Sequence, residues 1–88
     1  MTVLSIKTGT RKSVLRYEIP RQARVSNHIY SINGQKIKTL VDSVVLPGSY
    51  MAVWNGVDDR GNEIGSGMYF CVLEADTCLI VRKLMLMK

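Results

Sequence analysis

The chain has 88 residues, enough for one small domain, and its hydrophobic share of 47% suffices for a two-layer core without a metal or a disulfide. Its net charge of +5 is dispersed in basic runs of at most two residues, and a single Trp and a single Phe offer no platform for stacked bases, which argues against nucleic acid as a partner. No apolar run approaches the roughly 20 residues of a membrane-spanning helix, and residues 1–7 lack the charged and apolar regions of a signal peptide.

Apolar and polar residues alternate with a period of two along almost the whole chain, and this period predicts strands rather than helices. A first strand is expected near residues 3–7. The second strand carries Leu15, Tyr17 and Ile19 on one face and ends at Pro20, because proline has no N–H to donate to a ladder.

The third strand, residues 25–29, leads into the pair Asn33-Gly34, which is the strongest short signal for a β-hairpin. We expect a type I′ turn there, with positive φ at both residues of the pair. The return strand carries Ile37 and Leu40 and is expected to end at a loop around residues 42–43.

Three further strands complete the pattern. The fifth ends on Trp54 and is followed by a polar, glycine-rich loop; the sixth begins near Tyr69. Residues 74–77 are expected to form the last turn, and residues 79–87 the last strand. The apolar stripes of these strands predict a structural core that includes Tyr17, Ile29, Tyr50, Trp54, Tyr69 and Leu73.

Seven short strands with one apolar stripe each predict an all-β fold, in which two antiparallel sheets bury their stripes against each other as a β-sandwich. We assign Trp54 to this core because it alternates in step with Tyr50 and Ala52. The alternative is a sugar-stacking role for Trp54 or Tyr69 at the surface.

Four residues with side-chain oxygens cluster in the loop after the fifth strand: Asp58, Asp59, Asn62 and Glu63. Oxygen ligands of this kind can hold calcium. The full spacing of a calcium-binding loop is absent, however, and Asp, Asn and Gly are also the residues that close polar turns. We interpret the segment as a polar connection and expect neither a metal nor another cofactor.

The two cysteines, Cys71 and Cys78, flank the last turn and would form a disulfide if the register placed them opposite each other. Alternatively, Cys71 continues the inward stripe as a free thiol, and the sequence leaves both arrangements open. His28, the only histidine, is expected to point away from the core, so no Cys–His nucleophile pair is predicted. Motifs of hydrolases, phosphate loops and zinc sites are absent from the sequence, and we expect no enzyme activity.

Asn27 interrupts the apolar stripe of the third strand. A buried amide must find hydrogen-bond partners. Either this strand lies at the edge of a sheet, or the side chain satisfies a neighbouring loop.

The last strand is apolar on both faces at residues 84–87, whereas a strand with one solvated face alternates. Either its two methionines tuck under a loop, since methionine adapts to irregular gaps, or one stripe awaits a partner. We place the candidate contact with a partner protein here, at Lys83, Met85, Met87 and Lys88.

Motifs in a particular order resemble a known family. Arg16-Tyr17-Glu18-Ile19-Pro20 closes a strand, Pro47-Gly48-Ser49-Tyr50 leads into the tryptophan strand, and Gly67-Met68-Tyr69-Phe70 opens the strand after the glycine-rich loop. Over most of its length the chain resembles the immunoglobulin-like module first named in the flagellar hook-capping protein. It is even more similar to the C-terminal sorting domains of the type IX secretion system, which also carry terminal lysines spaced as Lys83 and Lys88.

The resemblance implies a seven-stranded immunoglobulin/fibronectin III-like antiparallel β-sandwich over residues 1–88, the C-terminal module of a larger bacterial protein. It further implies a non-catalytic sorting and anchoring domain that the machinery for secretion and surface attachment recognises. The protein would then be secreted or held at the cell surface (outer membrane), with its signal peptide upstream of Met1. The isolated domain is expected to be a monomer, with the parent protein's preceding domain as its neighbour.

The chain departs from the sorting domains in one respect. Those domains commonly open with an Asn-Pro-Phe segment, and residues 3–12 contain none of it. Two other functions therefore stay open: a hook-cap-like structural or assembly module, and a carbohydrate-binding accessory module. An exposed row of aromatic side chains would favour the carbohydrate-binding module.

Overall fold

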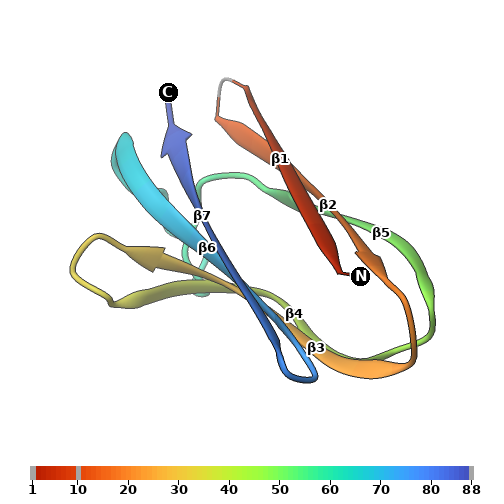
Figure 1. Cartoon of the computed structure of the whole chain (residues 1–88). Coiled ribbons are helices and arrows are strands. Elements are labelled where there is room, and N and C mark those ends of the chain that lie inside the picture. Colours follow the sequence, from red (N-terminus) through yellow and green to blue (C-terminus); the bar gives the residue numbers. More distant parts are fainter. Residues whose placement is uncertain (1, 10, 88) are drawn as a thin grey trace.

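Seven strands of seven to ten residues make up the structure, a computed structural model that describes residues 2–9 and 11–87. Short turns and one longer loop, residues 55–66, join them (Figure 1). Within the described ranges no helix is long and apolar enough to cross a membrane. The strands are β1 (Val3–Gly9), β2 (Lys12–Ile19), β3 (Ala23–Ser31), β4 (Lys36–Val45), β5 (Gly48–Trp54), β6 (Gly67–Ala75) and β7 (Cys78–Leu86).

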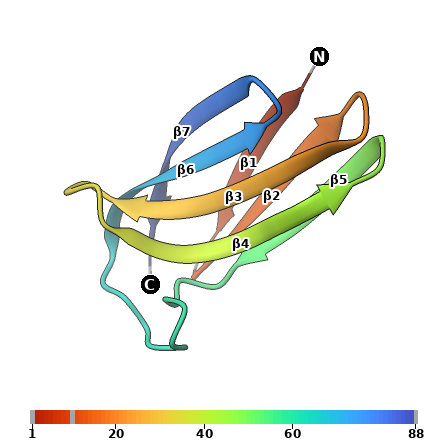
Figure 2. The ribbon, with the colours of Figure 1, turned by 90° about the horizontal axis from the view of Figure 1, so that it is seen from below.

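The strands form a three-stranded sheet in the order β1-β2-β5 and a four-stranded sheet in the order β4-β3-β6-β7, and every pairing is antiparallel. The two sheets face each other in Figure 1, and Figure 2 shows the loop between β5 and β6 projecting beyond one end of them. The prediction of an all-β fold with two antiparallel sheets is confirmed, and the arrangement is consistent with a β-sandwich.

The core lies between the sheets because each strand turns its apolar stripe inward. Trp54 is fully buried at the end of β5, and its indole N–H donates to the carbonyl oxygen of Val57 at 2.9 Å. Its ring meets the Tyr69 ring edge-on, with 5.4 Å between the centroids. Of the residues assigned to the core from the sequence, Tyr17, Ile29, Trp54 and Leu73 are buried, while Tyr50 and Tyr69 are half-buried and pack against them.

β4 is longer than the sequence indicated, because it continues through residues 42–43, where a loop was predicted. The prediction was wrong because Asp42 has a cross-strand partner: Nη2 of Arg24 on β3 lies 2.7 Å from its Oδ1. Two shifts in the pairing of β3 with β4 leave Leu40 and Ile37 without a direct opposite residue. Such bulges explain the three-residue spacing of these two apolar residues, which breaks the period of two.

The hairpin between β3 and β4 does not contain the type I′ turn expected from Asn33-Gly34. Of this pair, only Gly34 has a positive φ, 82°. The Gly34 N–H donates to the Ser31 carbonyl oxygen at 3.0 Å, and the Ser31 N–H donates to that of Gln35 at 2.9 Å. This is the pattern of a type I turn followed by a glycine in the left-handed region, so a single positive φ suffices.

The hairpin between β6 and β7 is tighter than the turn predicted at residues 74–77. Only Asp76 and Thr77 join the strands, and Asp76 has a positive φ of 54°. Ala75 therefore pairs directly with Cys78. Turn length fixes the register of a hairpin, so this turn decides which β7 residues face the core.

Asn27 lies fully buried in β3, a central strand, so neither a sheet edge nor a neighbouring loop accounts for it. Its Oδ1 accepts a hydrogen bond from the Cys71 thiol at 3.0 Å. Its Nδ2 has no hydrogen-bond partner among the residues that the structure describes. A buried donor without a partner destabilises a fold by ~1–3 kcal/mol.

We therefore expect the Asn27→Val variant to be more stable than the parent by ~1 kcal/mol, since it removes an unsatisfied donor and keeps the side chain short. Thermal unfolding followed by circular dichroism should show a Tm about 4–8 °C higher for a domain of this size. The control is Ser26→Val on the outer side of β3, for which we expect a change within about 0.5 kcal/mol. A lower Tm for Asn27→Val would contradict the prediction and indicate that an internal water satisfies the amide.

Candidate functional site

β7 alternates between core and solvent at its C-terminal end. Leu84 and Leu86 are buried, whereas the side chains of Met85 and Met87 are 48% and 60% exposed. Lys83 is exposed on the same side as Met85, because alternate residues of a strand share a face. The interpretation in which the methionines tuck under a loop is therefore wrong. Lys88, the remaining residue of the predicted contact, lies outside the described residues.

Cross-strand pairing extends the outer stripe of β7 onto β6. Met85 lies opposite Met68, and Val81 lies opposite Val72. Four apolar side chains of this surface are exposed: Met68, Leu79, Val81 and Met85. We call the surface the β6–β7 face and define it by Met68, Phe70, Val72, Glu74, Leu79, Val81, Lys83 and Met85.

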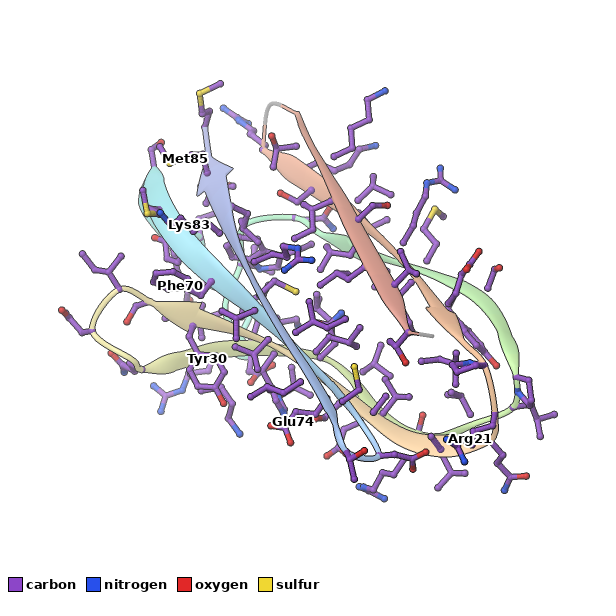
Figure 3. All side chains as sticks on the ribbon, viewed as in Figure 1. Arg21, Tyr30, Phe70, Glu74, Lys83 and Met85 are labelled. Carbon is purple, nitrogen blue, oxygen red and sulfur yellow. The ribbon has the colours of Figure 1, made fainter. Side chains whose placement is uncertain are left out.

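A row of four side chains crosses the four-stranded sheet at the level of Lys83. Tyr30 of β3 lies opposite Phe70, and Lys36 of β4 lies opposite Tyr30, so two lysines flank two half-buried aromatic rings. Figure 3 shows Lys83, Phe70 and Tyr30 on the same side of the sheet. Sequence reasoning missed this row, because its members come from four different strands and only the register brings them together.

His28 points outward from β3, with its Nδ1 3.0 Å from the hydroxyl oxygen of Thr39. Cys71 is buried on the inner side of the same sheet, so the two residues form no nucleophile pair. His28 shares an open pocket of about 450 Å³ with Ser26 and Asp42, whose carboxylate is engaged in an ion pair. In the described part of the chain no hydrogen bond joins Ser26 to His28, and the pocket shows no oriented nucleophile and base.

The side chain of Asp58 closes its own loop. Its Oδ1 accepts hydrogen bonds from the backbone N–H groups of Asn62 and Arg60, each at 2.9 Å. The hydrogen bond from Asn62, assisted by the one from Arg60, lowers the pKa of Asp58 below its ordinary value of 3.8. The carboxylate is thus used by the turn itself.

Asp59 fastens the same loop to the free edge of β4. Its Oδ1 accepts a hydrogen bond from the Thr39 N–H at 3.0 Å, and its own N–H donates to the Ile37 carbonyl oxygen at 3.1 Å. The loop therefore covers part of a strand edge whose unpaired backbone groups would invite association with other chains. Across residues 2–9 and 11–87, no three His, Cys, Asp or Glu side chains are grouped to hold a metal ion.

The two cysteines are free and are not opposite each other. Cys71 pairs with Arg82, and Cys78 pairs with Ala75. Of the two arrangements that the sequence left open, the structure shows the free thiols. Burial raises the pKa of the Cys71 thiol to about 12, whereas Cys78 is half-buried next to the turn.

No protein-family model matches the chain, and no curated protein matches its sequence. Methionines and valines on the β6–β7 face offer adaptable apolar contact, and Lys83 offers charge, a combination suited to binding a partner.

Because the pKa of Asp58 is lowered in the folded loop, its stabilising effect is present above the ordinary value of 3.8 and is lost as the pH falls through the lowered value. In an NMR titration we expect the amide resonances of Arg60 and Asn62 to move together with one apparent pKa below 3.8. The Asp58→Asn variant should show no such transition. A shared pKa at or above 3.8 would contradict the hydrogen-bonding of this turn.

We expect Cys78 to react with a thiol reagent in the native protein and Cys71 to react only after unfolding. A thiol with a pKa of about 12 is ~10⁻⁴ ionised at pH 8, and the thiolate is the reactive form. Alkylation followed by mass spectrometry distinguishes the two sites, and Cys78→Ser is the control. Rapid labelling of Cys71 in native Cys78→Ser would show that this thiol is accessible and would refute the prediction.

Proposed function

We propose that this chain is a non-catalytic sorting and anchoring domain, the C-terminal module of a larger bacterial protein, which the type IX secretion and surface-attachment machinery recognises. The observation that carries the proposal is the outer stripe of β7, where Lys83, Met85 and Met87 face solvent while the alternate residues fill the core. The ordered motifs that resemble type IX sorting domains supply the identity of the partner. On this proposal the parent protein is secreted or displayed at the cell surface.

The fold class that accompanies this proposal is an immunoglobulin/fibronectin III-like sandwich. With the strands lettered A to G in chain order, the two sheets are A-B-E and D-C-F-G. The constant-type immunoglobulin domain has the sheets A-B-E-D and C-F-G, so the two arrangements differ only in the sheet that strand D joins. Tyr69, near the start of the sixth strand, donates its hydroxyl to the Gly65 carbonyl oxygen at 2.7 Å. Immunoglobulin domains carry such a tyrosine corner at the same place, and both features support the assignment.

One observation favours carbohydrate binding as a second candidate function. Tyr30 and Phe70 lie side by side and half-buried on the outer side of the four-stranded sheet, and two adjacent aromatic rings are a surface on which a sugar could stack. Trp54 and Tyr69, for which sugar stacking was considered from the sequence, pack together toward the core instead. A Tyr30→Ala variant separates the two functions: loss of polysaccharide binding with unchanged sorting would favour the second candidate.

The sorting proposal is tested by fusing the domain to the C-terminus of a periplasmic reporter in a bacterium with type IX secretion. Lys83→Glu combined with Lys88→Glu should reduce the fraction of reporter at the cell surface by ~10-fold, which corresponds to about 1.4 kcal/mol of lost recognition. The readout is surface labelling of the reporter, with Tm values that show each variant to be folded.

The matched control reverses two exposed charges on the other sheet, Lys7→Glu combined with Arg16→Glu. It changes the net charge equally but leaves β7 intact, so sorting should match that of the parent. Normal sorting of the Lys83/Lys88 variant, or an equal loss in the control, would remove the support for the proposal.

A further inference from the structure

The outer side of the four-stranded sheet carries opposite charges on two sides of an apolar centre. The centre is the cross-strand pair Val72 and Val81. Lys83 lies two pairs along the ladder in one direction, and Glu74 lies two pairs along in the other, so both share the outer face with the valines. Figure 3 shows the two labelled side chains separated along the length of the sheet. The charges are thus arranged as a dipole across the valines.

β3 and β4 extend both charged rows across the sheet. The basic row contains Lys83 and Lys36, with Phe70 and Tyr30 between them. The acidic row contains Glu74 and Asp42, with Ser26 between them. Asp42 is already held in an ion pair with Arg24 on its own sheet. No ion pair within residues 2–9 and 11–87 involves Glu74 or Lys83. These two groups therefore remain available to a partner.

We infer that this face is the interface between two copies of the chain. The relating two-fold axis lies between the two facing sheets, runs across their strands and passes over the Val72–Val81 pair. Such an interface is isologous, since the same patch on each copy meets itself. The rotation lays the basic row of each copy over the acidic row of the other, which brings Lys83 next to Glu74 of the second copy at two symmetric places. The strands of the two sheets run nearly aligned, as in other face-to-face sheet packings.

The charge pattern selects a second copy over a partner of uniform charge. An acidic partner would complement Lys83 but oppose Glu74 with like charge, and a basic partner would do the reverse. A second copy satisfies both rows by symmetry. The valines and the aromatic side chains supply apolar burial, while the charged rows fix the orientation. This inference goes beyond the proposed function and departs from the monomer expected from the sequence.

Sedimentation equilibrium of the parent chain from about 10 µM to about 1 mM should show a dimer whose dissociation constant rises with salt, because salt screens exposed charges. Glu74→Lys alone and Lys83→Glu alone should each weaken dimerisation by ~10-fold, since each places like charges opposite one another. The double variant reverses both signs and keeps the complementarity, so its dissociation constant should return to within about 3-fold of the parent value.

The control is Lys7→Glu, an equal change of charge on the three-stranded sheet, which should leave the dimer unchanged. A parent chain that stays monomeric throughout the series would overturn the inference, and so would a double variant that is no closer to the parent than the single ones. The double variant also distinguishes this inference from the proposed sorting function. It has lost Lys83 but keeps the charge complementarity, so it should dimerise normally and yet fail to bring its reporter to the cell surface.

Discussion

One geometric constraint connects the core of this protein to its exposed surface: successive side chains of a strand point to opposite faces. Once Leu84 and Leu86 are in the core, Met85 has to face solvent. Fully burying a side chain of this size contributes ~1.5–3 kcal/mol, so an exposed methionine forgoes stabilisation that a partner surface can supply. The exposed stripe on β7 therefore follows from the same alternation that packs Leu84 and Leu86 into the core.

The loop between β5 and β6 keeps that packing fixed. It begins beside Trp54, whose indole N–H is bonded to the loop, and Asp59 joins it to the edge of β4. A Cβ atom at Gly56 would lie 3.0 Å from Cδ1 of Leu86, and Gly56 has a φ of 74°. Glycine is thus required there for two reasons, contact distance and backbone conformation. The loop thereby holds the inward stripe of β7 at the point where the outer stripe carries Met85.

The strands could be predicted from the sequence because the alternation of apolar and polar residues is a local property. The bulges in β4 could not be predicted in this way. Bulges at Leu40 and Ile37 exist only relative to β3, and Asp42, which lies across from Ser26, is held by an ion pair with Arg24 two residues away on the same strand. The candidate site divides in the same way. The sequence showed the stripe on β7, because apolar residues there occupy both faces of the strand. The alignment of Lys83 with Tyr30 could not be predicted, because it depends on strand registers that the two-residue turn between β6 and β7 helps to set.

Taken together, the two proposals make recognition depend on concentration, because the same face would bind both a second copy and an export receptor. In the proposed dimer Lys83 is covered, so the apparent affinity for the proposed receptor would be the intrinsic affinity reduced by the fraction of monomer. Solvent-exposed ion pairs contribute ~1 kcal/mol or less each, so Lys83 and Glu74 orient the dimer more than they strengthen it. In the proposed dimer, apolar burial at the Val72–Val81 centre would supply the driving force. Under the two proposals, dilute chains would expose the stripe to the receptor, and concentrated chains would cover an exposed apolar surface of the kind that promotes aggregation.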